Sequence, residues 1–544
     1  MKRFLLILLL TSQLALAGSV YYADNMADNS GNGTVSQPFS SIAKAFTQLQ
    51  AGDTLFIRGN SSAPPRIYSE ELYLSSSAAS GKEGQPIVVT SYPGELVKII
   101  PKKSFGIYTA YWIFENLIFD MDGKSYDLIK LRGDHITFRN CELTNGQKDG
   151  IDANNASNNL IEHCTIHNFV RNDQYDAHGI ILNGGVDNVI RNNTIFDCKG
   201  DCIQLYKEDQ NYGTIIEGNN LYTTLGPNSE NAIDVKAARH LTIRNNKMHG
   251  FHKAEDSDGV ALKINKDTDN ILVYGNDIFE SNGGIRVSGG DVDTIRIERN
   301  VIHDLHADGG ETSKYGYGIQ MDGVNHFTLI NNTFANLPGP LFWIASRGAD
   351  GVTIENNIFY KANKFKGSTS DLKDVKLIDY NGWFQCKETF PAPHDVTGED
   401  PMFVDETGYD YRLREGSPAI DKGDPNTGTD FPGERVDLGA FEFEPSTGIN
   451  TEPVVTPNQT DLLKAYPNPF NPQTTLEFQL DKTSMVRLDI FNVLGQRVDT
   501  LLNELRKPGL YRVRWLAKAL PAGIYFVRLQ IHNNFSVHPV VLLK

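Results

Sequence analysis

Three cationic side chains recur at similar intervals in the middle of the chain. Lys236, Lys263 and Arg286 are separated by 27 and 23 residues. If each interval is one turn of a repeating structure, the three side chains lie beside one another on one surface. Clustered cations neutralise a carboxylate, and a lysine beside another cation has a lowered pKa and can accept a proton near neutral pH. We therefore predict that these residues form a catalytic group that removes a proton next to a carboxylate, with a lysine of the Lys236 and Lys263 pair as the base.

Four oxygen-bearing side chains accompany this group, at Asp201, Asn231, Asp234 and Asp258. Carboxylate and amide oxygens are ligands that Ca²⁺ accepts, and a bound cation would neutralise the same carboxylate. We therefore predict Ca²⁺ as a cofactor and these four residues as its ligands. An acidic residue beside a glycine is also a common turn former, so Asp201 and Asp258 can instead be structural.

Three further residues are candidates for binding the substrate. They are Gln204, Tyr206 and Arg239. Tyr206 can stack on a sugar ring or be an ordinary surface aromatic residue, and both roles remain open at this point.

The elements that position these residues belong to an internal repeat between residues 110 and 360. Short apolar runs end in a polar pair and an asparagine, and successive runs are 23 to 32 residues apart. The recurring position is held by Asn116, Cys141, Cys164, Asn193, Asn219, Asn246, Asn276, Asn300, Asn332 and Asn357. The runs alternate as strands do and the repeats contain no helical pattern, which predicts one coil of a right-handed parallel β-helix per repeat. Stacked asparagines can form ladders of side-chain amides between coils.

A second strand in each coil begins with a small residue and an inward aliphatic residue. We align Ile233, Val260 and Ile285 as equivalent inward positions. Strand side chains alternate and adjacent coils are about 4.8 Å apart. Lys236 and Lys263 are therefore predicted to stand side by side.

The sequence at both ends of the chain differs from that of the repeat. Residues 1–17 combine Lys-Arg, an apolar run and a small-residue ending, which is typical of a cleavable signal peptide. Residues 18–444 are the predicted β-helix, with a capping helix that begins after Ser41. Residues 445–462, rich in Thr, Pro and Asn, are a predicted linker, and residues 463–544 are a predicted small β-sandwich. The fold class is therefore all-β.

Composition and charge exclude several classes of function. The chain has 544 residues and a net charge of −16, which gives no general attraction to nucleic acid. Beyond the signal peptide no stretch approaches ~20 uninterrupted apolar residues, so no membrane span is expected. Five cysteines are too few for a disulfide framework. Cys141 and Cys164, in neighbouring repeats, are either free thiols or one bridge.

The C-terminal region resembles the sorting domain of the type IX secretion pathway. The resemblance rests on residues 466–472 (Tyr-Pro-Asn-Pro-Phe-Asn-Pro), 491–498 (Phe-Asn-Val-Leu-Gly-Gln-Arg-Val) and 521–529 (Pro-Ala-Gly-Ile-Tyr-Phe-Val-Arg-Leu). It implies export through the periplasm to the cell surface or the medium, with the secretion machinery as a partner.

The region before it resembles the β-helical polysaccharide lyases. Residues 21–24 (Tyr-Tyr-Ala-Asp) and 52–59 (Gly-Asp-Thr-Leu-Phe-Ile-Arg-Gly) look like their N-terminal signature. Residues 231–236 (Asn-Ala-Ile-Asp-Val-Lys) are similar to the alginate and chondroitin lyase group, which implies that Lys236 is the base. Residues 258–263 (Asp-Gly-Val-Ala-Leu-Lys) are similar to a calcium-site motif of the pectate lyases, which implies that Asp258 is a ligand.

Together these observations predict a secreted lyase that cleaves an acidic, uronic-acid-containing polysaccharide by β-elimination. A glycoside hydrolase on the same fold is one alternative, and it would use two carboxylates, such as Asp234 with Asp258 or Asp149 with Asp152. A non-catalytic surface protein that binds carbohydrate along the solenoid is the other. In that case the lysines are ordinary solvated surface residues.

Overall fold

The computed structural model describes residues 18–444, except 29, 172–174, 227, 254–256, 363–364, 387–388, 390–391, 399 and 428–432, and residues 464–542, except 467–469, 471, 481–483, 493–496, 508, 518–519, 522 and 532–533. The predicted signal peptide (1–17) and the predicted linker (445–462) lie outside the described residues. The chain divides into two compact units, residues 1–445 and 446–544, and each has its own hydrophobic core.

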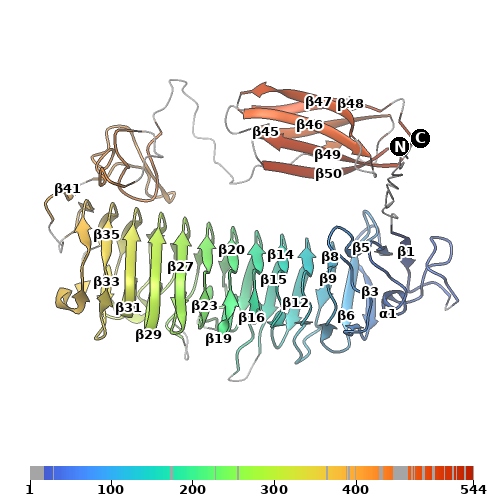
Figure 1. Ribbon diagram of the computed structural model, residues 1–544, viewed down its shortest axis with the longest axis horizontal. Coiled ribbons are helices and arrows are strands. Elements are labelled where there is room, and N and C mark those ends of the chain that lie inside the picture. The colour runs from blue at the N-terminus through green and yellow to red at the C-terminus, as the bar shows by residue number, and fades with distance from the viewer. Residues whose placement is uncertain are drawn as a thin grey trace, which may run out of the picture. The chain divides into compact units, whose positions relative to one another are not determined.

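The first unit is a stack of coils whose strands pair in parallel with those of the neighbouring coils (Figure 1). Sheets of 27 and 14 strands enclose one elongated core. Most coils contribute two strands to the larger sheet and one to the smaller, so the stack has three walls. The predicted all-β parallel solenoid is confirmed.

The wall that carries the predicted site residues is called the site wall below. Its strands are β4 (Tyr73–Leu74), β7 (Phe105–Ile107), β10 (Ile129–Leu131), β13 (Ile151–Asn154), β16 (Ile180–Val186), β19 (Ile203–Tyr212), β22 (Ile233–Val235), β26 (Val260–Ile264), β33 (Phe342–Ile344), β37 (Phe365–Lys366) and the first halves of β29 (Gly283–Glu298) and β31 (Tyr317–Ile330).

The second wall completes the larger sheet. It contains β1 (Val20–Ala23), β2 (Thr54–Ile57), β5 (Ile87–Ser91), β8 (Trp112–Glu115), β11 (Thr137–Arg139), β14 (Leu160–Glu162), β17 (Val189–Arg191), β20 (Ile215–Glu217), β24 (Thr242–Arg244), β27 (Thr268–Tyr274), β35 (Thr353–Glu355), β39 (Leu377–Asp379) and the second halves of β29 and β31. Three short strands lie between these two walls: β23 (Ala238–Arg239), β34 (Ala349–Asp350) and β38 (Leu372–Lys373).

The third wall is the smaller sheet. It is built from β3 (Arg66–Glu70), β6 (Val97–Pro101), β9 (Ile118–Asp120), β12 (Glu142–Gly146), β15 (Thr165–Phe169), β18 (Thr194–Cys198), β21 (Asn220–Tyr222), β25 (Lys247–His249), β28 (Asp277–Phe279), β30 (Val301–His303), β32 (Thr333–Leu337), β36 (Ile358–Ala362), β40 (Gly382–Phe384) and β41 (Val396–Gly398). Short 3-10 turns occur at η1 (Asp308–Gly310) and η2 (Thr369–Asp371).

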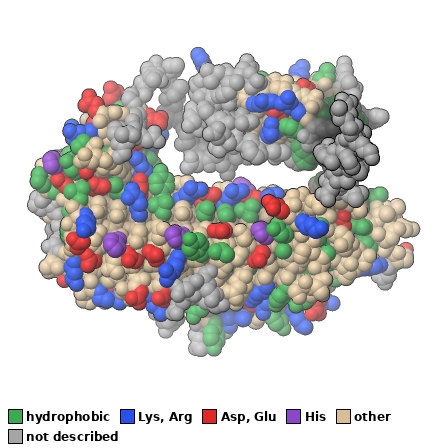
Figure 2. Space-filling view, in the orientation of Figure 1, with side chains coloured by type: hydrophobic (Ala, Val, Ile, Leu, Met, Phe, Trp, Pro, Cys, Tyr) green, Lys and Arg blue, Asp and Glu red, His purple; other side chains and the backbone are tan. Residues whose placement is uncertain are grey.

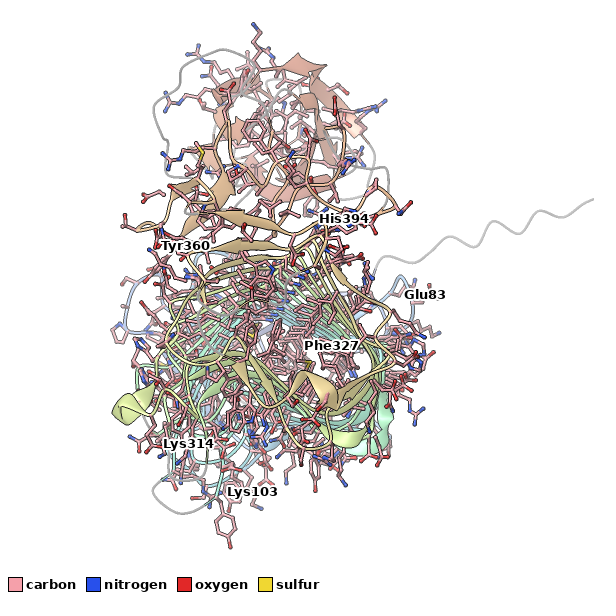
Figure 3. The ribbon with its side chains drawn as sticks, turned by 90° about the vertical axis from the view of Figure 1, so that its left-hand side faces the viewer. Glu83, Lys103, Lys314, Phe327, Tyr360 and His394 are labelled. Carbon is pink, nitrogen blue, oxygen red and sulfur yellow. The ribbon has the colours of Figure 1, made fainter. Side chains whose placement is uncertain are left out.

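Apolar side chains fill the interior of the stack because they alternate along each strand with outward polar ones. On the site wall, Ile233, Leu262 and Ile285 are fully buried. Burial of such a side chain stabilises the fold by about 1.5–3 kcal/mol relative to exposure. Figure 3, a view along the stack, shows the buried Phe327 inside the coils.

The register of the site wall differs from the predicted one at a single coil. Ile233 pairs with Leu262 rather than with Val260, and Leu262 in turn pairs with Ile285. Both Val260 and Leu262 are apolar and buried. A shift of two residues keeps every side chain on its own face, so the alternation of apolar and polar residues does not distinguish the two registers.

The asparagine repeat forms the predicted amide ladder. From one coil to the next, each side-chain NH₂ donates to the following side-chain oxygen at 2.8 to 3.0 Å. The ladder comprises Asn193, Asn219, Asn246, Asn276, Asn300, Asn332, Asn357 and Asn381. The amides are buried and fully paired, and they therefore hold the coils in register along one corner of the stack.

At the N-terminal end of the ladder the position changes residue type. Cys141 and Cys164 occupy it as buried free thiols, so the disulfide alternative is excluded. The assignment of Asn116 to this position is wrong by one residue: Asn116 has a φ of 59° and lies in the turn, and the buried Leu117 follows it. An αL turn favours asparagine as well, which explains the error.

The first coil is covered by the helix α1 (Ile42–Phe46). Ser41 caps this helix, because its hydroxyl accepts the backbone N–H of Lys44 at 3.1 Å. The carboxylate of Glu70 accepts the N–H groups of Ile42 and Ala43 at 3.1 and 2.9 Å. The helix therefore has its first amide groups satisfied by side chains.

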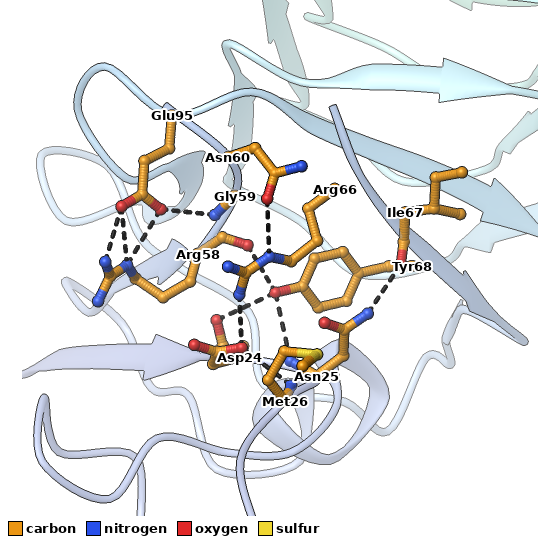
Figure 4. A network of polar contacts seen from close by, with 11 residues as sticks. Asp24, Asn25, Met26, Arg58, Gly59, Asn60, Arg66, Ile67, Tyr68 and Glu95 are labelled. Carbon is orange, nitrogen blue, oxygen red and sulfur yellow. Dashed lines mark hydrogen bonds and ion pairs between the residues drawn. The ribbon is translucent and has the colours of Figure 1, made fainter. Parts of the chain in front are cut away.

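A polar network holds the chain around this cap (Figure 4). Arg66 pairs with Asp24 at 2.6 Å, and Arg58 pairs with Glu95 at 2.7 Å. Tyr68 donates its hydroxyl to the carbonyl of Arg58 at 2.7 Å. Burial raises the pKa of Tyr68 to about 12, so it stays a hydrogen-bond donor throughout the physiological range.

The opposite end of the unit carries a hairpin of β42 (Phe403–Asp405) and β43 (Asp410–Leu413), and Tyr411 of this hairpin contacts the third wall. Its hydroxyl donates to Asp304 at 2.7 Å. The buried His303 places Nδ1 2.9 Å from Asp304 and Nε2 3.0 Å from Asp277. Burial lowers the pKa of His303, but hydrogen bonds to the two carboxylates outweigh it, and the net pKa is raised.

We expect the hairpin to be held less firmly at alkaline pH. Because the folded pKa of His303 is raised above its unfolded value of about 6.5, its stabilisation is fully present below that value. It is lost as pH rises through the folded pKa. Thermal unfolding measured as a function of pH should show this decline, and His303→Gln should flatten it. An equal decline in the variant would contradict the assignment.

The second unit contains two antiparallel sheets. Its strands are β44 (Lys464–Tyr466), β45 (Gln473–Leu480), β46 (Ser484–Asn492), β47 (Arg497–Arg506), β48 (Gly509–Leu516), β49 (Gly523–Ile531) and β50 (Asn534–Leu542). The buried Asp489 pairs with Arg487 at 2.8 Å and Arg528 at 3.1 Å. In the part of the chain that the structure describes, no helix has the length and apolar character needed to cross a membrane.

Candidate active site

A cleft of about 800 Å³ opens on the site wall. It extends over consecutive coils, from β19 to β29, and the loop after β33 contributes Arg347. Its lining residues are Asp176, Tyr206, Glu230, Asp234, Lys236, Ala237, Lys263, Asn265, Lys266, Asp267, Ser288, Gly289 and Arg347. Of the residues predicted from sequence, Tyr206, Asp234, Lys236 and Lys263 are brought together here.

Lys263 belongs to an outward row with one side chain from each coil. The row runs Gln204, Asp234, Lys263, Arg286, Gln320, Trp343 and Lys366. Lys263 therefore lies between an acidic and a cationic neighbour, Asp234 and Arg286. The predicted in-register pairing of Lys236 with Lys263 is wrong, because the strand of Lys263 is shifted by two residues.

Lys236 follows the end of β22 and contacts two residues of the cleft. Its Nζ lies 3.7 Å from Oδ2 of Asp234 and 5.7 Å from the ring centroid of Tyr206. Tyr206 is 52% exposed, so much of its ring remains accessible to a ligand. The two lysines thus share one open cleft although they do not stack.

A buried polar layer lies under the cleft. Asp201 accepts Nδ2 of Asn231 at 2.7 Å through Oδ1 and Nε2 of Gln204 at 2.8 Å through Oδ2. The backbone N–H of Asp201 donates to Nδ1 of His178 at 2.9 Å. All four side chains are buried. Gln204 is therefore a support for Asp201, and its predicted contact with substrate does not fit its buried position.

Two acidic side chains of the cleft have strongly shifted pKa values. Burial, together with the negative charges of Asp201 and Asp176, raises the pKa of Glu230 to about 8. Burial and the charge of Asp201 raise the pKa of Asp234 to about 6. The positive charges of Lys236 and Lys263 oppose both shifts. Both carboxyl groups are therefore protonated at a higher pH than an exposed carboxyl group.

Three predicted site residues lie away from this cluster. Arg286 pairs through Nη1 with Oδ2 of Asp258 at 3.1 Å, and neither is among the described lining residues. Arg239 is exposed in β23, beside Tyr212 and Asp269 in register. Asp258 therefore neutralises Arg286 and does not join Asp234 in the cleft.

Sequence reasoning missed several lining residues. Glu230 directly precedes the predicted ligand Asn231, and Asn265 is two residues after Lys263 on the same face, so alternation alone could have found the latter. Nδ2 of Asn265 donates to Asp234 at 2.6 Å. Arg347 comes from a distant loop, where it pairs with Asp322 at 2.6 Å, and no pattern in the sequence links it to the cleft.

The oxygen chemistry under the cleft is of the type that Ca²⁺ binds. Asp201, Glu230 and Asp234 supply carboxyl groups, and Asn231 supplies an amide oxygen. Among these groups, Asn231 donates a hydrogen bond to Asp201. Across the described residues, no group of three or more His, Cys, Asp or Glu side chains is already arranged to hold a metal ion.

The positive charge available to an anion is local to the cleft. On the face of the β-helix seen in Figure 2, basic and acidic side chains are interspersed. The cleft has four basic and four acidic lining residues. Because a pKa of about 8 keeps Glu230 mostly protonated at neutral pH, the balance in the cleft is cationic.

Comparison with known families supports both halves of the chain. Residues 20–226 match the family model described as "Pel9A-like, right handed beta helix region", and residues 178–359 match "Right handed beta helix region". Residues 464–542 match "Secretion system C-terminal sorting domain". The predicted right-handed β-helix and the predicted sorting domain are confirmed, and the protein is exported to the cell surface or the medium.

Individual proteins similar to this chain include pectate lyases. Pectate lyase PEL9 of Emericella nidulans is 28% identical over 154 residues, which is 28% of this chain and 34% of the relative. The match thus spans about a third of that curated protein. The crystal structure of pectate lyase Pel9A has a TM-score of 0.44 at 18% identity and covers 78% of this chain and 96% of its own. A mannuronic acid specific polysaccharide family 6 lyase from human gut microbiota has a TM-score of 0.45 at 16% identity and covers 68% and 87%.

Proposed function

From a chain that joins a Pel9A-like right-handed β-helix to a secretion sorting domain, we propose a lyase that cleaves an acidic polysaccharide by β-elimination. The supporting observation is the position of Lys263, between Asp234 and Arg286 in one outward row that crosses an open cleft. Lys236 and the exposed ring of Tyr206 lie in the same cleft. The arrangement provides a base, cations for a sugar carboxylate and a surface for a sugar ring.

In this reaction the base takes the proton from the carbon next to the uronate carboxylate. The electron pair of that C–H bond forms a C=C bond, and the adjacent C–O bond to the next sugar breaks. The leaving oxygen receives a proton from water. Lys236 binds the substrate carboxylate, and Arg347 stabilises the charge that builds up on this carboxylate during proton removal, which favours the transition state over the bound substrate.

Lys263 is assigned as the base because of the contacts of the two lysines. Nζ of Lys236 lies 3.7 Å from Oδ2 of Asp234, in an ion pair that suits it to binding rather than to proton removal. Lys263 lines the cleft between Asp234 and Arg286 in the outward row, where its amine can reach a substrate. The proposal therefore assigns proton removal to Lys263 and substrate binding to Lys236 and Tyr206.

Ca²⁺ is part of the proposal as a ligand of the acidic cluster. Asp201, Glu230, Asn231 and Asp234 would hold it, and the bound ion would supply positive charge close to the substrate carboxylate. Glu230 replaces Asp258 in the ligand set predicted from sequence, because Asp258 pairs with Arg286. Calcium would displace protons from the cluster as it binds.

Addition of Ca²⁺ should raise the melting temperature of the full-length protein, since a ligand that binds only the folded state stabilises it. Glu230→Gln should reduce this rise, because it removes one carboxylate from the cluster. Asp258→Asn is the matched control and should keep the full rise. Differential scanning fluorimetry with and without Ca²⁺ measures the effect. Equal shifts in both variants would remove Glu230 from the ligand set.

A glycoside hydrolase is the second candidate, because Glu230 and Asp234 are carboxyl groups with raised pKa values in one cleft. The pairs predicted from sequence are less suitable, since Asp258, Asp149 and Asp152 are not among the described lining residues.

One screen distinguishes these functions. The full-length protein is incubated with polygalacturonate, alginate and chondroitin, and ultraviolet absorbance of the unsaturated product is recorded together with reducing ends. A lyase increases both signals. Reducing ends without absorbance indicate a hydrolase, and binding without either signal indicates a non-catalytic protein.

A further inference from the structure

A pair of exposed tyrosines lies on the site wall near the N-terminal end of the stack. Tyr73 in β4 and Tyr108, directly after β7, have ring centroids 5.3 Å apart. They are 58% and 39% exposed. Between them is Gly106, where an added Cβ would lie 2.9 Å from the ring of Tyr73 and 3.0 Å from that of Tyr108. The glycine therefore lets both rings lie against the strand. These three residues are called the tyrosine platform below.

The tyrosine platform is aligned with the cleft. Gly106 lies in the row that leads through successive coils to Lys263, and Tyr73 pairs with Gly106 in register. A second row, two residues further along each strand, runs Tyr108, Arg132, Asn154, Asn183 and Tyr206. Tyr108 and Tyr206 are four coils apart, which corresponds to about 19 Å at about 4.8 Å per coil.

Between its two tyrosines this row carries polar side chains suited to sugars. Arg132 pairs with Asp152 at 2.6 Å, and Asn183 donates to the same carboxylate at 3.1 Å. Nη1 of Arg132 also donates to the backbone carbonyls of Leu131 and Asp152, at 2.9 and 2.6 Å. Asp152 thus orients both side chains. In Figure 3, Lys103 and Lys314, which precede the site-wall strands β7 and β31, both project from the lower side of the stack.

We propose that the tyrosine platform is a second carbohydrate-binding subsite. It holds a distant part of the same polysaccharide chain whose reacting bond lies in the cleft, so the inference rests on the proposed function. Aromatic rings stack on the apolar faces of sugars, and the guanidinium and amide groups of the row bind hydroxyl or carboxylate oxygens. The cleft itself crosses several coils, so a polymer that follows it towards the N-terminus reaches the tyrosine platform.

The test compares a polymer with a short oligosaccharide. Tyr73→Ala/Tyr108→Ala is made in the full-length protein, both alone and together with Lys263→Ala to prevent turnover. Binding of polygalacturonate should weaken about 10-fold, as expected for the loss of two stacking contacts. Binding and cleavage of trigalacturonate, which the cleft can hold without the tyrosine platform, should be unchanged.

Two further variants separate ring position from general surface effects. Gly106→Ala keeps both tyrosines but displaces their rings, and it should also weaken polymer binding. Tyr212→Ala removes a tyrosine of similar exposure, 45%, that packs on His240 instead. This control should leave polymer binding unchanged.

The outcomes are distinct. Weaker polymer binding with intact trigalacturonate cleavage supports the subsite. Unchanged polymer binding overturns the subsite proposal and leaves the lyase proposal in place. The same holds if polymer binding is unchanged and light scattering shows that the tyrosines mediate self-association. If the parent protein neither binds polygalacturonate nor forms unsaturated product from trigalacturonate, both proposals are overturned for this polymer class.

Discussion

Lys263→Ala should lower the rate of unsaturated-product formation by at least about 100-fold. A positioned general base contributes about 10²–10⁴ to the rate of proton transfer, and alanine removes the amine without filling its place. The effect should fall on kcat, because Lys236, Tyr206 and Arg347 remain to bind the substrate. Steady-state kinetics on whichever acidic polymer the screen identifies would measure it, with ultraviolet absorbance as the readout.

Two controls make this result specific. Lys366→Ala removes a lysine of the same row, four coils beyond Lys263, whose Nζ lies 3.2 Å from the ring centroid of Trp343. This variant should leave kcat unchanged. Lys236→Ala should mainly raise KM, as expected for lost ground-state binding. If Lys236→Ala abolishes turnover and Lys263→Ala retains more than a tenth of it, the roles of the two lysines are reversed.

Asn276→Ala should lower the free energy of unfolding of the β-helix by about 2–4 kcal/mol. Oδ1 of Asn276 accepts both the backbone and side-chain N–H groups of Asn246, and its Nδ2 donates to Oδ1 of Asn300 and to the carbonyl of Ile243. Removing one amide therefore leaves several buried polar groups without partners, at about 1–3 kcal/mol for each unsatisfied group before relaxation. Urea-induced unfolding followed by circular dichroism measures the loss.

Asn228→Ala is the matched control for this effect. Its side chain is exposed and donates to the carbonyl of Leu225 at 3.1 Å. The free energy of unfolding should change by less than about 0.5 kcal/mol. A similar small change for Asn276→Ala would mean that the ladder is not a main source of stability, and that apolar packing between coils holds the stack.

The effects expected for Asn276→Ala and Lys263→Ala depend on the amide ladder and on the candidate site, and these two features were predictable from sequence to different degrees. The ladder was predicted from sequence because asparagine recurs once per coil. Only in a stack of coils can the same residue type bond to its equivalent in the next coil. The structure added Asn381 and moved the N-terminal position from Asn116 to Leu117. Both changes are small, because the hydrogen bonds between coils leave little freedom in register at this corner.

The candidate site was less predictable, although its wall was. Lys236, Lys263, Asp234 and Tyr206 reach one cleft, as the alternation of side chains indicated. Which lysine faces which charge depends on a two-residue shift in β26, and that shift moves no side chain to another face. In place of the predicted pair of Lys236 and Lys263, the structure therefore has a row of Asp234, Lys263 and Arg286.

Other parts of the site have no local signal. Asp258 had the sequence context of a calcium ligand, yet Arg286 of the next coil neutralises it, and the carboxyl groups of the cleft with raised pKa values are Glu230 and Asp234. Their raised pKa values come from burial and from Asp201, a residue of the preceding coil. Arg347 arrives from a loop that lies far along the chain.

The amino-acid sequence by itself determined the coil period, two of the strands of each coil, the inward and outward faces and the export domain. These are set by periodicity and by local turn preferences, which act within one coil. Tertiary structure alone decided the stagger between coils, the charges that face each lysine and the shape of the cleft. Those features depend on backbone hydrogen bonds and electrostatic contacts between residues 20 or more positions apart, where alternation of apolar and polar side chains carries no information.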